Sequence, residues 1–288
     1  MENNPPDFKH KFSRQPTLPT LPIGIQHLLA TLADENLTYP KLAKEIINHP
    51  NIVARLVALA NSAWAAPVVP ITDLETACAR LGMSIVRSTS LALAIASPFN
   101  PARCPGFDIE RFWSTGILVS EGAAILATKA KPEIFLDEAK GTAQTAGILH
   151  HFGLLWFADQ MPDETAKALK MRMNTPPISL SQALRQLTYT DYTAVGGWIA
   201  REWGLPELLA TAVEQHLSLE YKQEFWEITL LVGSAARMAA ALLRGDEEKP
   251  ENYRLESLGI SLSTQDAVFE QMTKKLDGCR EMARALSL

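Results

Sequence analysis

Apolar residues recur every three to four positions along nearly all of the chain after Thr17, and no segment alternates strictly as a strand does. Stripes over Leu42–Ile47, Ile52–Ala60 and Leu74–Leu81 predict three short helices. A longer pattern predicts a helix over Ile109–Lys129. The chain is therefore predicted to be an all-α protein of about a dozen helices joined by short loops.

Capping and turn signals define several helix ends. Ser179 and Gln182 form a capping box, in which each side chain satisfies a free backbone N–H, and this predicts the start of a helix. Gly204 and Pro206 predict a tight turn, because glycine suits the end of one helix and proline the start of the next. Further helices are predicted over roughly 137–160, 223–243 and 263–286.

The helices are predicted to form two packed lobes. Residues 100–106 hold two prolines and a glycine and predict the boundary between the lobes. Residues 1–16 are polar and contain prolines, so we expect a disordered N-terminal tail. The expected parts are this tail, an N-terminal helical lobe over 17–106, a second helical lobe over 107–216, and C-terminal helices over 217–288 that pack on the second lobe.

Net charge, cysteine spacing and the length of apolar stretches limit the partners and the location that we expect for the protein. The formal net charge is −5, so no overall positive field draws the chain to nucleic acid, and direct nucleic-acid binding is not expected. Cys78, Cys104 and Cys279 are far apart and show no zinc-type spacing, which favours a reducing, cytoplasmic setting. No stretch approaches the roughly 20 apolar residues that span a bilayer, so we expect no membrane insertion.

Two adjacent histidines, His150 and His151, lie inside the apolar segment predicted to be helical over 137–160. Imidazole is the commonest protein metal ligand and the usual acid–base group near neutral pH, so the doublet marks a candidate site. With His216 the two residues could form a zinc or iron site, because three neutral imidazoles bind Zn²⁺ well. The alternative interpretation is that both are hydrogen-bonded polar groups beside an old cleft.

Several short motifs follow one another in an order and spacing more specific than any one of them. They are Leu18–Pro22, Arg55–Ala63, Leu74–Gly82, Phe112–Trp113, Gly147–His150, Trp203–Pro206 and His216. Together they resemble the HDOD domain, an output domain related to the HD-type metal-dependent hydrolases, over about residues 17–216. The resemblance implies an HD-like helical bundle in the second lobe and a signalling or regulatory role in bacteria.

The resemblance also assigns the positions at which an HD hydrolase holds its metal ions. Such an enzyme uses an upstream histidine, a His-Asp doublet and a downstream aspartate, and the matching residues here are Thr115, His150, His151 and Ala236. Only His150 keeps its ligand type, and both carboxylates that would hold a hard cation are lost. We therefore expect a degenerate metal site with no catalytic residue, no bound cofactor and no enzymatic activity.

These sequence features are compatible with three functions. The first is a non-catalytic output protein that acts through protein–protein contacts in bacterial signal transduction, in a response-regulator pathway with a sensor kinase or another regulator as partner. The second is a residual metal-dependent phosphohydrolase acting on nucleotides or cyclic dinucleotides. The third is a sensor that binds a small anionic ligand in the old cleft, with His150 and His151 in contact with it.

Overall fold

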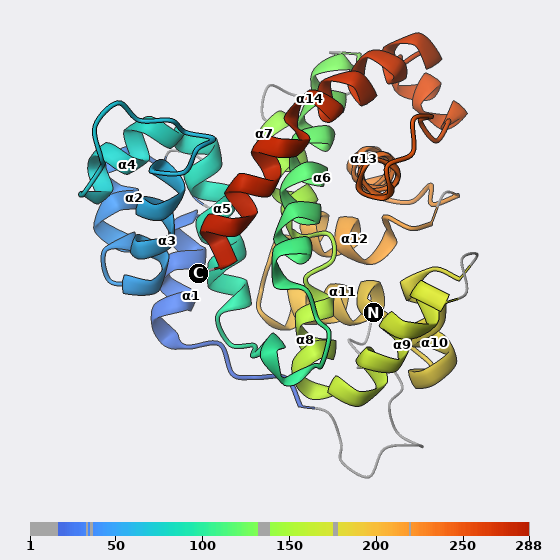
Figure 1. Cartoon of the computed structure of the whole chain (residues 1–288), viewed down its shortest axis with the longest axis horizontal. Helices are drawn as coiled ribbons and strands as arrows, with labels where there is room; N and C mark the ends of the chain where they lie inside the picture. The colour runs from blue at the N-terminus through green and yellow to red at the C-terminus, as the bar shows by residue number, and fades with distance from the viewer. Residues whose placement is uncertain are drawn as a thin grey trace.

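The structure is a computed structural model that describes residues 17–32, 34, 37–131, 139–174, 178–218 and 220–287. Throughout these residues the regular structure is helical, with fourteen α-helices, two short 3₁₀ helices and no strand (Figure 1). The all-α prediction is confirmed. The predicted tail, residues 1–16, lies outside the described residues, as does the predicted start of the helix over 137–160.

The first five helices form what we call the N-terminal lobe, at the left of Figure 1. They are α1 (Ile23–Leu32), α2 (Tyr39–Ile46), α3 (Pro50–Ala60), α4 (Leu74–Leu81) and α5 (Met83–Ala96). A proline in the first turn starts both α2 and α3, because its fixed φ suits that position. Asp73 caps α4 by accepting a hydrogen bond from the Thr76 amide, and Gly82, at φ 83°, allows the turn into α5.

The second lobe is built around one long central helix, α6. Its elements are η1 (Pro101–Arg103), α6 (Ile109–Lys129), α7 (Ala139–Leu149), α8 (Gly153–Gln160), α9 (Pro162–Asn174), α10 (Leu180–Thr188), α11 (Tyr192–Glu202) and α12 (Glu207–Gln215). The bounds of α6 and the capping box of Ser179 and Gln182 confirm the sequence predictions. Gly204, at φ 71°, makes the predicted turn between α11 and α12.

The prediction of one continuous helix over residues 137–160 is wrong. The segment over 137–160 forms two helices, α7 and α8, which are separated by a turn at residues 150–152. Gly153, the first residue of α8, lies so close to α11 that a Cβ atom there would overlap the carbonyl oxygen of Tyr192. The break lets α8 turn away from α7 and approach α11, a contact between segments far apart in the sequence.

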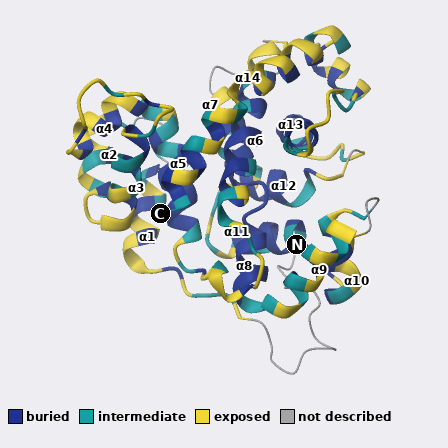
Figure 2. Cartoon of the chain, viewed as in Figure 1, coloured by how far each residue is buried: buried dark blue, intermediate teal, exposed yellow. Residues whose placement is uncertain are grey.

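The last elements are α13 (Trp226–Arg244), η2 (Tyr253–Leu258) and α14 (Leu262–Ser287). Both α13 and α14 pack on α6, and α14 continues across to α3 in the N-terminal lobe (Figure 1). Trp64, in the loop after α3, lies against Gly278 of α14. Lys275 and Arg284 of α14 form ion pairs with acidic residues of α6. Figure 2 shows the buried residues concentrated along α6 and α13.

One helix in the described part of the chain, α13, is by itself long and apolar enough to cross a membrane. The pair α4 and α5 passes the same test together but bends by 114° between the two helices. In α13, 67% of the apolar window is buried inside the protein. This burial is the pattern of a core helix, which is apolar on most of its sides because other helices surround it.

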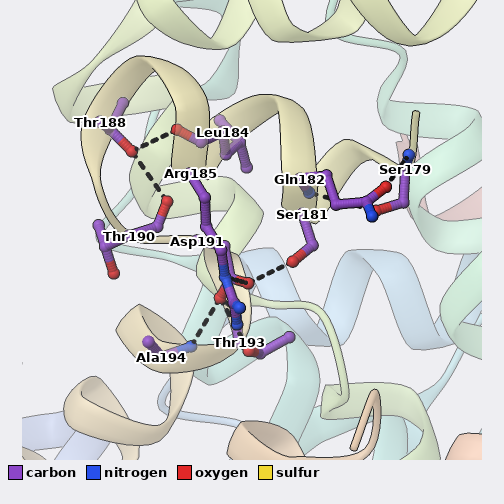
Figure 3. A network of polar contacts seen from close by, with 10 residues as sticks. All are labelled: Ser179, Ser181, Gln182, Leu184, Arg185, Thr188, Thr190, Asp191, Thr193 and Ala194. Atoms are coloured by element: carbon purple, nitrogen blue, oxygen red, sulfur yellow. Dashed lines mark hydrogen bonds and ion pairs between the residues drawn. The ribbon is translucent and has the colours of Figure 1, made fainter.

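A buried carboxylate joins α10 to α11 (Figure 3). Asp191 accepts hydrogen bonds from the backbone amides of Thr193 and Ala194 and from the Ser181 hydroxyl, and it pairs with Arg185 at 2.7 Å. Burial works against the charged form, but these donors outweigh it and lower the pKa of Asp191. The network fixes the first turn of α11 and thereby the position of the residue that follows Asp191.

Candidate functional site

The three histidines singled out from the sequence lie together in the core and form what we call the imidazole cluster. His150 and His151 are in the turn between α7 and α8, and His216 directly follows α12. The His150 and His151 rings stack with centroids 4.1 Å apart and 18° between their planes. The His216 ring meets His150 edge-on at 5.1 Å. No member is more than 4% exposed.

Backbone carbonyls fix the proton on each ring. His150 Nδ1 donates to Gly147 at 2.7 Å, His216 Nδ1 donates to Val213 at 2.8 Å, and His151 Nε2 donates to the Phe112 carbonyl at 3.1 Å. A carbonyl can only accept, so the protonated nitrogen of each ring follows from its partner. The other nitrogens of His151 and His216 are buried lone pairs without a hydrogen-bond partner.

The cluster is uncharged at neutral pH. Burial lowers the pKa of His151 to about 3 and that of His216 to about 4. Burial also lowers the pKa of His150 well below its usual value, and the neighbouring imidazoles add to this effect. The three rings therefore carry no positive charge that would attract an anion, and they hold no proton that they could readily give up to a substrate.

Two aromatic rings border the imidazole cluster. Phe112 of α6 stacks on His151 with centroids 4.3 Å apart, and Tyr192, the first residue of α11, lies 6.1 Å from His216. Burial raises the pKa of the Tyr192 phenol above its usual range, so that group stays protonated. Both rings that border the cluster are therefore uncharged.

Thr115 and Ala236, the other two positions that the resemblance assigns, lie on α6 and α13. Thr115 of α6 donates its hydroxyl to the Arg111 carbonyl of its own helix at 2.8 Å, and its neighbour Gly116 faces the His151 ring. Ala236 lies on α13, one turn after Gly233, which is in such close contact with His216 that a Cβ would overlap the His216 carbonyl oxygen. Four elements therefore converge here, but the side chains from α6 and α13 supply neither a histidine nor a carboxylate.

The residues of the imidazole cluster do not fit a resident zinc or iron ion. Such an ion needs ligand atoms that converge on one point about 2.1 Å away. The stacked rings of His150 and His151 instead lie face to face. Within the described ranges, no group of three or more His, Cys, Asp or Glu side chains is placed to hold a metal ion.

Comparison with known proteins identifies the family. Residues 18–219 match the sequence model of the HDOD domain, which is more than half of the chain. This chain belongs to the HDOD family. The predicted resemblance is therefore confirmed, and the match includes the imidazole cluster of the HDOD protein as well as its N-terminal lobe. No curated protein matches the chain significantly.

Solved structures share the fold of this HDOD protein. A protein named for an inferred role in signal transduction, from Marinobacter aquaeolei VT8, superimposes with a TM-score of 0.82 at 21% identity; the match covers 94% of this chain but 60% of that protein. An HDOD domain protein of unknown function from Geobacter sulfurreducens superimposes with a TM-score of 0.72 at 21% identity. The match covers 94% of this chain and 93% of that protein. A protein named as an inferred phosphohydrolase, from Shewanella amazonensis SB2B, superimposes with a TM-score of 0.71 at 23% identity. The match covers 93% of this chain and 95% of that protein. At these identities the likeness concerns the fold.

Sequence reasoning overlooked two residues beside the imidazole cluster. Tyr192 carries no sequence signal, because its place against His216 depends on how Asp191 anchors α11. Arg237 does carry one, since it is the single charged residue in the apolar run from Ile228 to Leu243. A lone charge inside a core helix calls for a partner, and it follows directly after Ala236.

Proposed function

We propose that this HDOD protein is a non-catalytic output protein of bacterial signal transduction. It acts through protein–protein contacts in a response-regulator pathway, with a sensor kinase or another regulator as its partner. The composition of the imidazole cluster is the observation that carries the proposal. Two buried, uncharged histidines, His150 and His151, stand at positions where the resemblance places the ligands of a metal-dependent hydrolase, and no carboxylate stands at any of those positions.

An exposed apolar loop supports the role of protein contacts. Val68 and Val69, between α3 and α4, are 100% and 70% exposed. The Asn61 side chain holds the backbone of Ile71 through two hydrogen bonds of 2.7 and 2.8 Å, and Arg80 donates to backbone carbonyls near the start of the loop. A loop fixed in this way loses little conformational freedom on binding, which favours its use as an apolar anchor for a partner protein.

Location in the cytoplasm is part of the proposal. Cys78, Cys104 and Cys279 are buried free thiols. Burial raises the pKa of Cys78 to about 11 and that of Cys279 to about 12, so these thiols stay protonated and unreactive. Buried thiols without disulfides suit a reducing compartment.

The catalytic alternative is tested by assaying the purified protein with Mg²⁺, Mn²⁺ and Zn²⁺ on nucleotides and cyclic dinucleotides. We expect no turnover above that of the His150→Ala variant. Metal-dependent turnover that His150→Ala abolishes would favour the residual phosphohydrolase and reject the proposal.

The contact surface is tested by capture of partners from the native host. We expect the double variant Val68→Asp, Val69→Asp to lose a signalling protein that the wild type retains. Met173→Asp, at an equally exposed apolar residue of α9, serves as the matched control and keeps the partner. Equal capture by both variants would show that this loop is not the contact surface.

A further inference from the structure

Arg237 is a partly buried charged group that has no ion-pair partner among the described residues. Its Nε and Nη2 atoms are shielded from solvent, and neither has a hydrogen-bond partner. Burial lowers the pKa of this guanidinium, and no carboxylate of the described residues offsets the effect. Donor groups that are shielded from water and have no hydrogen-bond partner are costly. Such a group therefore indicates a position where a ligand supplies the opposite charge.

The two unpartnered atoms define the shape of that ligand. The Nε–H bond and one Nη2–H bond lie parallel on one edge of the planar guanidinium of Arg237. This pair of donors matches two oxygen atoms of a carboxylate or a phosphate, which it binds side-on through two parallel hydrogen bonds. An oxyanion satisfies both donors at once, whereas a single carbonyl oxygen satisfies them poorly.

Further arginines lie on α13 itself and on α9. Arg244 lies seven residues further along α13, which is about 10.5 Å on the same side of the helix. Burial lowers the pKa of Arg172 on α9, and the nearby charges of Arg111 and Arg244 lower it further. Arg244 pairs with Asp246, but within the described ranges neither Arg172 nor Arg111 has an ion pair.

The position of Arg237 connects it to the imidazole cluster. Gly233, in contact with the His216 carbonyl, lies four residues before Arg237 on the same side of α13, about 6 Å along the helix axis. The lone pair of His216 Nε2 is buried and unpartnered as well. A phosphate suits the two free donors of Arg237, since it offers several oxygens that can accept from them.

We propose that Arg237 anchors a binding site for a phosphate-bearing small molecule. Arg237 donates its Nε–H and Nη2–H groups to two phosphate oxygens. This inference goes beyond the proposed function and does not depend on it, because the protein alone binds the ligand. It differs from the sequence-based sensor hypothesis, in which the uncharged His150 and His151 contact the anion.

Calorimetry on the full chain tests the proposal with three probes at constant ionic strength: inorganic phosphate, adenosine monophosphate and adenosine. We expect both phosphate-bearing probes to bind and adenosine not to bind. A tighter complex with the nucleotide than with inorganic phosphate would identify a nucleotide as the source of the phosphate. Binding of adenosine as strong as that of its monophosphate, or no binding of either phosphate-bearing probe, would overturn the proposal.

Two substitutions of Arg237 distinguish the contribution of its paired donors to phosphate affinity from the contribution of its positive charge. Arg237→Lys keeps the charge but loses the paired donors, so we expect phosphate affinity to fall at least tenfold. Arg237→Met removes both, and we expect it to abolish binding. Arg280→Met, at an exposed arginine of α14, is the matched control and leaves the affinity unchanged. Wild-type affinity in Arg237→Met would place the phosphate elsewhere and contradict the proposal.

Thermal unfolding gives a second readout that a purely structural arginine would not produce. In phosphate-free buffer Arg237→Met should have a higher Tm than the wild type, because two shielded donors without a partner are removed. Added phosphate should raise the Tm of the wild type and leave that of Arg237→Met unchanged. A lower Tm for Arg237→Met, with no effect of phosphate on the wild type, would show that Arg237 serves the fold alone.

Discussion

His151 is fixed to Phe112 in two ways. Its ring stacks on the Phe112 ring with centroids 4.3 Å apart, and its Nε2 donates to the Phe112 carbonyl at 3.1 Å. The turn between α7 and α8 is thereby attached to the first turn of α6. An aspartate at this position could do neither, because an ionised carboxylate only accepts hydrogen bonds and has no ring.

The substitution His151→Asp recreates the His-Asp doublet, but we do not expect it to restore hydrolase activity. We expect a loss of about 3 kcal/mol or more in the free energy of unfolding, because the new carboxylate is buried without a partner. Urea denaturation measures this loss. His27→Asp, on the exposed side of α1, is the control and should change stability by less than about 0.5 kcal/mol. A stable His151→Asp variant that hydrolyses phosphodiesters would contradict the expectation.

Acid should destabilise the protein well before its carboxylates titrate. In the unfolded chain histidine binds a proton near pH 6.5, whereas in the folded protein the pKa values of His151 and His216 are about 3 and about 4. The unfolded state therefore binds more protons between these limits, and stability is complete above pH 6.5 and falls as the pH drops towards 4. From pH 7 to pH 5, His216 alone should account for about 2 kcal/mol.

Urea denaturation at pH 7 and pH 5 checks this dependence. The His216→Gln variant cannot bind the proton, so its stability should change less between the two pH values than that of the wild type. Equal stability of the wild type at both pH values would mean that the imidazole cluster is open to water.

The Asp191 network should be the most sensitive polar contact in the second lobe. Asp191→Ala leaves the amides of Thr193 and Ala194 without their acceptor and removes a buried charge from its donors. We expect a loss of about 3–5 kcal/mol, measured by chemical denaturation. Asp73→Ala removes an exposed helix cap of the same residue type and should cost much less stability than Asp191→Ala. Similar losses in the two variants would show that the burial of Asp191 adds nothing.

Two glycines should respond in opposite directions to alanine. Gly233→Ala places a methyl group on the His216 carbonyl oxygen, where only a backbone shift can make room, so we expect a loss of about 2 kcal/mol or more. Gly141→Ala, on the open side of α7, meets no atom within 4 Å and should gain about 0.5–1 kcal/mol from helix propensity. Differential scanning calorimetry distinguishes the two. A neutral Gly233→Ala would mean that α13 and His216 are less tightly packed.

The sequence was sufficient to predict helix ends wherever the cap chemistry is local. The Ser179 capping box and the Gly204 turn depend on neighbouring residues, and both predictions hold. The break after α7 could not be predicted in this way. It depends on the contact between Gly153 and Tyr192, which are distant in sequence and are brought together by the packing of α8 on α11.

For the candidate site, the sequence identified the three histidines but not their chemistry. Their stacking and the position of each ring proton follow from backbone carbonyls of α6, α7 and α12 that no motif specifies. Arg237 was visible as a charge in an apolar run, yet its meaning depends on the absence of any partner for its Nε and Nη2 atoms. That property exists only in the folded chain.

The contacts of α14 extend the packed core of this chain beyond the end of the family match. The HDOD match ends at residue 219, whereas α13 and α14 cover two sides of α6 and α14 also rests on α3. A fragment cut at that boundary would leave the apolar surface of the central helix open to water, and such surface promotes aggregation. In this chain the residues that match the family model are thus fewer than the residues that together bury the central helix.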